Sequence, residues 1–150
     1  GQIRNVRGNS YSEDLVNEDS LAAIGWSGDI TLLNLEAGYE KWKFLLPEGG
    51  ATLWNDNFLI PIGSPRKTNA ETLINYYYEP AVAAEVAAYV NYVCPVKGAQ
   101  AEMEKIDPEL AKSEFIFPSE KMMANLNVFR SLSPTEESTW TEAFQKAAGN

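Results

Sequence analysis

Histidine is absent from this sequence, and Cys94 is its single cysteine. Without an imidazole, the chain cannot supply a Ser-His or Cys-His nucleophile pair or an imidazole-based zinc site. One cysteine cannot form an internal disulfide, and it has no second thiol for a metal or redox pair. We therefore expect Cys94 to be a small buried side chain, and we predict no catalytic residue, metal site or cofactor.

Basic residues are in the minority, and long apolar runs are missing. The chain has 12 Lys and Arg residues against 21 Asp and Glu residues, which gives a formal net charge of -9. Nucleic acid binding needs a basic surface, so this balance argues against it. The acidity suits a cationic ligand and equally suits plain solubility. No apolar run approaches the length of a membrane-spanning helix.

The length of 150 residues is enough for one domain with a substantial core, and 45% hydrophobic and 22% charged residues are ordinary for a globular protein. The chain opens on Gly1-Gln2-Ile3-Arg4, which has the character of the interior of a longer polypeptide and contains no signal peptide. We expect a larger parent protein whose leader lies outside this sequence.

Strands are expected mainly in the first half of the chain. Leu21–Gly25 is a compact apolar run bounded by polar residues, and Trp42–Leu46 is an apolar segment that ends before a proline. Both patterns are typical of strands. A third strand-like run lies between Gly50 and Gly63.

Capping signals predict helices beside these strands. Ser10 and Glu13 have the spacing of a capping box, so a short helix is expected over residues 14–17. Asp29 is expected to cap a second helix over residues 30–36.

After residue 68, helices are expected to dominate. Thr68–Glu71 has the capping-box pattern, and Pro80 separates this helix from the next because proline suits only the first helical turn. Further helices are expected over residues 99–105, after Asp107, and from Ser133–Glu136 onward. The inward-facing residues of this last helix are expected to be Trp140, Phe144 and Ala147.

Trp54 and Asp56 lie two residues apart in the run between Gly50 and Gly63. On a strand, residues i and i+2 project from the same face, so the indole and the carboxylate would point together. The indole ring attracts an ammonium group, and the carboxylate accepts its N–H donors. A core tryptophan beside a turn-capping aspartate explains the same residues without a ligand.

Four motifs follow one another in a characteristic order and spacing, and they are Ala23–Asp29, Phe44–Gly50, Leu53–Pro61 and Leu73–Pro80. Together they resemble the spermidine/putrescine-binding proteins of bacterial ABC importers, which are type 2 periplasmic binding proteins. The resemblance runs from about Tyr11 to the C-terminus. It implies an α/β fold that is the C-terminal half of a two-lobed protein. Residues 1–56 would belong to the second lobe, including the crossover strand, and residues 57–150 to the C-terminal part of the first lobe.

The resemblance also implies a ligand site. Its residues would be Trp26, Trp54, Asp56 and Tyr92. The indoles would hold the methylene chain and the amines, the carboxylate would fix one ammonium, and the tyrosine would stack on the alkyl chain or donate its hydroxyl. A glutamine contact of the family has no clear match, the nearest positions being Phe129 and Arg130. An arginine there would repel a polyamine, which leaves amine length and ligand class open.

By this resemblance, the chain is expected to be a non-enzymatic solute-binding component of an ABC transporter, either periplasmic or extracellular and membrane-anchored. Its expected partners are a polyamine, the permease, the N-terminal half of the same protein and, through an exposed half-cleft, a second copy of itself. Three alternatives stay open. The same fold could bind a sugar, an amino acid or an anion, the chain could be a hydrolase using Asp29 and Asp56, or it could be a pure interaction domain.

Overall fold

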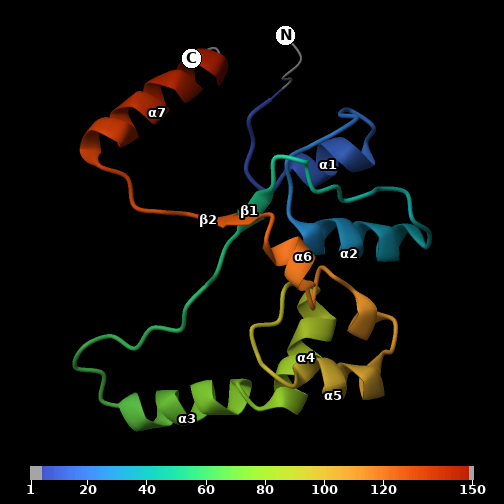
Figure 1. Cartoon of the computed structure of the whole chain (residues 1–150), viewed down its shortest axis with the longest axis vertical. Coiled ribbons are helices and arrows are strands. Elements are labelled where there is room, and N and C mark those ends of the chain that lie inside the picture. Colours follow the sequence, from blue (N-terminus) through green and yellow to red (C-terminus); the bar gives the residue numbers. More distant parts are fainter. Residues whose placement is uncertain (1–4, 149–150) are drawn as a thin grey trace. The chain divides into compact units, whose positions relative to one another are not determined.

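The computed structural model describes residues 5–148 and is dominated by helices, with one two-stranded sheet (Figure 1). The elements in chain order are α1 (Tyr11–Val16), α2 (Ser27–Ala37), β1 (Ala51–Leu53), α3 (Lys67–Tyr77), α4 (Pro80–Val90), α5 (Ala99–Ile106), the 3-10 helix η1 (Leu110–Lys112), α6 (Glu120–Met123), β2 (Leu126–Val128) and α7 (Pro134–Ala148). The chain divides into two compact units, one formed by Lys43–Asn127 and the other by the residues on either side of that range. Within the described range, no helix is both long and apolar enough to span a membrane.

The unit Lys43–Asn127 is built on the packing of α4 against α5. Its core contains two large side chains, Met103 and Ile116, which are 0% and 1% exposed, and Cys94 packs half-buried against it. The remaining members of this core cluster are Ala83, Ala84, Ala87, Ala99 and Ala111. Small alanine side chains let the two helices approach closely, and truncating a large side chain in such a core costs about 2–5 kcal/mol.

The start and end of α4 follow from two residues with special backbone conformations. Pro80 occupies the first helical position, where its fixed φ and missing N–H are tolerated, and this confirms the predicted break before it. Asn91 ends the helix in the left-handed region, at φ 56. The helix predicted over 99–105 is confirmed as α5, and Asp107 caps the following turn by accepting two backbone N–H bonds.

A glycine allows the chain to enter the sheet of β1 and β2. The Gly50 N–H donates to the Pro47 carbonyl at 3.0 Å, which closes a turn directly before β1. Gly50 has a φ of 93°, and a Cβ at this position would lie 2.5 Å from the carbonyl oxygen of Asn125. Only glycine combines this backbone conformation with such a close approach of the neighbouring backbone.

Replacing Gly50 by alanine is therefore expected to lower the free energy of unfolding by about 1–3 kcal/mol, because the new Cβ meets backbone rather than a flexible side chain. Urea unfolding monitored by circular dichroism measures the change. Gly49→Ala is the matched control, since a Cβ at Gly49 would meet open space. Equal stability of the two variants would contradict the role assigned to Gly50.

The second unit contains α1, α2 and α7. The side chains buried here are Tyr11, Leu15 and Ile30. The helix α2 ends at Gly38, and the Asn34 side chain then holds the returning chain. Its Oδ1 accepts from the N–H groups of Lys41 and Trp42, both at 2.9 Å, and its Nδ2 donates to the Trp42 carbonyl at 2.8 Å.

The strands predicted over residues 21–25 and 42–46 are wrong. In the part of the chain that the structure describes, β1 and β2 are the only strands, and neither predicted segment pairs with them. Leu21 and Ile24, which were expected to be buried, are fully exposed. An apolar run forms a strand only when a neighbour satisfies its backbone N–H and C=O groups. The first half of the described chain is therefore poor in strands.

Three predicted helix caps are also wrong in detail. Ser10 forms no side-chain cap on α1. Asp29 lies inside the first turn of α2, whose N-cap is Trp26. The helix α3 begins at Lys67, so Thr68 is already helical. A side-chain cap adds only about 1 kcal/mol, so other contacts can replace it or move the helix start by up to one turn.

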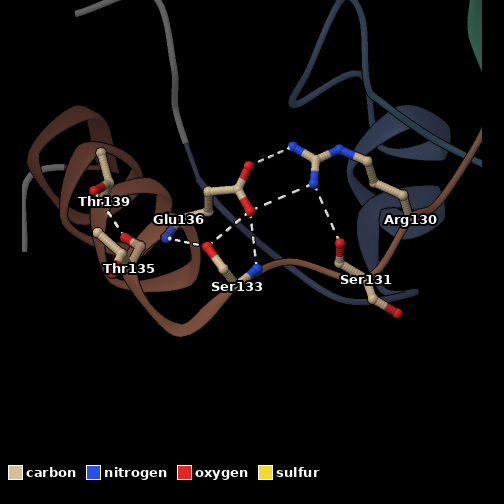
Figure 2. Close-up of polar contacts among 6 residues, drawn as sticks. All are labelled: Arg130, Ser131, Ser133, Thr135, Glu136 and Thr139. Atoms are coloured by element: carbon tan, nitrogen blue, oxygen red, sulfur yellow. Dashed lines mark hydrogen bonds and ion pairs between the residues drawn. The ribbon is translucent and has the colours of Figure 1, made fainter.

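The helix start predicted at Ser133 and Pro134 is confirmed, and the structure adds a capping box there, but the predicted burial of the helix is not confirmed. Figure 2 shows the Ser133 Oγ accepting from the Glu136 N–H at 3.3 Å, while Glu136 accepts from the Ser133 N–H at 2.8 Å and pairs with Arg130 at 2.8 Å. Trp140 and Phe144 are 67% and 58% exposed, and α7 buries none of its residues. An amphipathic face is buried only where another apolar surface covers it.

The hydrogen bonds around Glu136 predict a pH-dependent contribution to helix α7. The Arg130 guanidinium, followed by the Ser133 backbone and side chain, lowers the pKa of Glu136 from 4.5 to about 2. A carboxylate with a lowered folded-state pKa stabilises the folded state above its ordinary pKa and loses this effect as the pH falls through the lowered value. The difference in helix content between the wild type and Glu136→Gln should therefore be full above pH 4.5 and vanish towards about pH 2.

Far-UV circular dichroism over this pH range measures the difference, which should be small and reduced by salt because the ion pair is exposed. Glu137→Gln is the control, since Glu137 lies in the same first turn without the Arg130 bond. A pH-independent difference for Glu136→Gln would contradict the assignment.

Candidate functional site

The structure brings two of the four predicted site residues into contact. The rings of Trp54 and Tyr92 have centroids 5.4 Å apart and meet edge to face, with an interplanar angle of 73°. Trp54 directly follows β1, and Tyr92 follows α4, so the end of a strand and the end of a helix supply one aromatic each. Such pairs contribute about 0.5–1.5 kcal/mol beyond the area that they bury. The pair forms a defined aromatic surface in the unit Lys43–Asn127.

Asn91 determines the direction in which the chain leaves α4 and reaches Tyr92. It is 9% exposed, which makes it a buried polar residue, and its left-handed backbone stops the helix. Its Nδ2 donates to the carbonyl oxygens of Ala88 and Tyr89 at 3.2 and 3.3 Å, which occupies acceptors left open at the helix end. Asparagine and glycine are the residues that best tolerate this conformation.

Replacing Asn91 by alanine is expected to lower the free energy of unfolding by about 1 kcal/mol or more, because alanine disfavours positive φ and cannot cap the helix. Asn91→Gly should lose less, since glycine keeps the backbone conformation. Urea unfolding of both variants gives the comparison. Equal stability of the alanine variant and the wild type would contradict the role assigned to Asn91 at the end of α4.

Asp56 lies beyond the end of β1 at an exposed position. Because β1 ends at Leu53, the strand rule does not set a common face for Trp54 and Asp56. Trp54 is half-buried, whereas the Asp56 carboxylate is in contact with solvent and forms no hydrogen bond or ion pair with the described residues. The carboxylate can therefore accept N–H donors from outside this part of the chain, and its role as a ligand residue stays a prediction.

Trp26 belongs to the unit formed on either side of Lys43–Asn127. It is the N-cap residue of α2 and is 42% exposed, and its indole Nε1 donates to the Asn9 side chain at 3.2 Å. Its backbone N–H donates to the Tyr11 hydroxyl at 2.8 Å. Trp26 is thus a partly exposed residue whose backbone N–H and indole N–H both donate hydrogen bonds to neighbouring side chains.

Tyr11 and Asp29 form a polar contact beside Trp26 that the sequence did not predict. The Tyr11 hydroxyl donates to the Asp29 carboxylate at 2.6 Å. Burial, and then the bond to Asp29, raises the pKa of Tyr11 from 10 to about 12, so the phenol keeps its proton well above neutral pH. The two residues lie 18 positions apart, and no local sequence pattern joins them.

Arg130 carries the positive charge that was expected to repel a polyamine. The structure pairs this guanidinium with Glu136, with distances of 2.8 and 3.5 Å between nitrogen and oxygen atoms. The pair has no net charge while both groups are ionised. Arg130 is therefore a partner of the α7 cap, and its repulsion of a cation is partly offset.

Metal-ligand clusters and surface hollows are two other kinds of site that can be compared with the four predicted site residues. Among the residues that the structure describes, no group of three or more His, Cys, Asp or Glu side chains is arranged to hold a metal ion. A shallow hollow of about 350 Å³ lies at the start of α3 and is lined by residues 64–69. None of the four predicted site residues lines it.

Comparison with protein families identifies the class to which the chain belongs. Residues 1–114 match the family of bacterial extracellular solute-binding proteins. This match covers more than half of the sequence, so the chain is a member of that family. The family is described as one of bacterial extracellular solute-binding proteins.

Individual relatives are named for polyamines. The chain is 28% identical over 148 residues to the putrescine-binding periplasmic protein PotF of Escherichia coli, which covers 96% of this chain and 39% of the relative. It is 27% identical over 140 residues to the putrescine-binding periplasmic protein SpuD of Pseudomonas aeruginosa, covering 91% of this chain and 37% of the relative. It is 29% identical over 128 residues to a norspermidine sensor of Vibrio cholerae, covering 79% and 36%. The resemblance drawn from the four motifs is confirmed, and the chain spans well under half of the length of each relative.

Proposed function

We propose that this chain is the C-terminal half of a two-lobed, extracytoplasmic solute-binding protein that binds a polyamine between its lobes and delivers it to an ABC permease. Residues 1–56 would contribute to the second lobe and residues 57–150 to the first. The observation that carries the proposal is the 28% identity, over 96% of the chain, to a putrescine-binding periplasmic protein. The family to which the chain belongs supports a binding rather than a catalytic role.

The chemistry of the predicted residues supports a linear polyamine as the ligand. Trp54 and Tyr92 offer aromatic surface that packs on methylene groups and attracts ammonium groups. Asp56 offers an exposed carboxylate that can pair with one ammonium. Trp26 would add a second indole. The formal net charge of -9 adds long-range attraction for any cation.

The partners follow from the charge of the ligand. A diamine carries two ammonium groups, and burying each of them requires a partner that replaces water. Asp56 would serve one ammonium, so we infer that the N-terminal half of the protein supplies a group for the other. The isolated chain should then bind weakly. The binding protein would act in the periplasm, or on the cell surface if it is membrane-anchored, where it would meet the permease.

Titration calorimetry of putrescine and spermidine into the complete protein tests the proposal. We expect a dissociation constant in the micromolar range or tighter, which corresponds to about 8 kcal/mol. Asp56→Asn should weaken binding about tenfold or more, because the amide keeps the shape of the side chain but loses its charge. Trp54→Ala should weaken binding while far-UV circular dichroism still reports a folded protein.

Glu48→Gln is the control for Asp56→Asn, because it removes one negative charge from an exposed position on the turn before β1. An equal loss of affinity in both variants would mean that net charge, and not Asp56, attracts the ligand. Absence of heat with either amine would overturn the polyamine assignment and leave the family unchanged. Sugars, amino acids and anions would then be titrated, and conversion of any bound ligand would contradict a non-enzymatic role.

A further inference from the structure

We propose that Tyr11 is a positioning residue for the ligand-binding indole of Trp26, and that it acts together with Asp29. This inference rests on the proposed function for the role of Trp26 but on observed contacts for the role of Tyr11. The three residues lie in one unit of the chain, on α1, at the N-cap of α2 and in its first turn.

The Tyr11 hydroxyl forms two hydrogen bonds at the start of α2, one as a donor and one as an acceptor. Its proton is donated to the Asp29 carboxylate at 2.6 Å, and its oxygen accepts the Trp26 backbone N–H at 2.8 Å. The donor role is fixed, because a carboxylate can only accept and a backbone N–H can only donate. The hydroxyl therefore ties the residue before the helix to the first helical turn.

The Tyr11 ring adds a steric constraint on the residue before Trp26. A Cβ built on Gly25 would lie 2.5, 2.7 and 2.9 Å from the Cε2, Cζ and hydroxyl oxygen of Tyr11. The ring thus occupies the space that a side chain at Gly25 would need, and the backbone rests directly on it. Because Tyr11 is buried, this contact is shielded from solvent as well as close.

The indole of Trp26 also forms a hydrogen bond with a residue close to Tyr11 in the sequence. Its Nε1 donates to the Asn9 side chain at 3.2 Å, two residues before Tyr11. The segment 21–25 that leads into Trp26 forms no strand, so it gains no sheet hydrogen bonds that would fix its course. Contacts from Tyr11 and Asn9 fix Trp26 instead. The Tyr11 hydroxyl binds the Trp26 backbone N–H, and the Asn9 side chain binds the indole N–H.

Fixing an aromatic side chain before the ligand arrives lowers the entropy that binding must remove. Loss of the Tyr11 hydroxyl should leave the ring in contact with Gly25 but release the Trp26 N–H and one acceptor bond of Asp29. We expect an affinity loss of about three- to tenfold for the polyamine, which is the size of one hydrogen bond. The effect should arise through Trp26, because the hydroxyl is already engaged by Trp26 and Asp29.

The test uses Tyr11→Phe in the complete protein, with Tyr39→Phe as the matched control because Tyr39 is an exposed tyrosine of the same unit. Two quantities are measured. Calorimetry gives the putrescine and spermidine affinities, and NMR of the ligand-free protein gives the hydrogen exchange rate of the Trp26 amide and the position of its indole N–H signal. Tyr11→Phe should weaken binding, speed exchange at Trp26 and shift the indole signal, while Tyr39→Phe changes none of these.

A Trp26→Ala background separates positioning from direct ligand contact. If Tyr11 acts through the indole, adding Tyr11→Phe to Trp26→Ala should cause no further loss of affinity. An undiminished further loss would overturn the proposal, and so would unchanged exchange and indole signals in Tyr11→Phe alone. If the wild type binds no polyamine but Tyr11→Phe still releases Trp26, the proposed function fails while the positioning of Trp26 by Tyr11 stands.

Discussion

The packing of α4 against α5 is the contact on which the unit Lys43–Asn127 depends. Alanine side chains bring the two helices close enough for Met103 and Ile116 to be completely buried, and apolar burial is the main favourable term in folding. The end of α4 also determines the position of Tyr92. The helix stops where Asn91 adopts a left-handed backbone, and the next residue, Tyr92, contacts Trp54. A change in the packing of α4 against α5 would therefore move Tyr92 relative to Trp54.

Neighbouring groups decide which carboxylates of this chain can bind an external cation. Asp29 accepts the Tyr11 hydroxyl, and Glu136 is paired with Arg130, so both have internal partners. Asp56 has no hydrogen bond or ion pair within the described residues and keeps its lone pairs for another donor. The pairing with Glu136 also changes the significance of Arg130, since a charge that is compensated locally repels a distant cation much less than a free one.

Signals that act within one helical turn could be read from the sequence, whereas contacts between distant residues could not. Pro80 and Ser133 mark helix starts because proline geometry and side-chain caps are local effects. The segment 21–25 has the composition of a strand, but a strand forms only beside a partner strand, and this segment has none. In the same way, the apolar face of α7 is exposed because no other apolar surface covers it. The resemblance supplied Trp54 and Tyr92 as candidates, but their mutual contact depends on how α4 ends.

The exposure of Asp56 limits what this half of the proposed site can do by itself. An ion pair in contact with water contributes only about 0–1 kcal/mol, whereas a micromolar complex requires about 8 kcal/mol in total. The remainder must come from excluding water around the pair and from covering the methylene groups of the ligand. Both effects require a second surface over Trp54, Tyr92 and Asp56. In the proposed two-lobed protein the other lobe would provide that surface, so tight binding and lobe closure would be a single event.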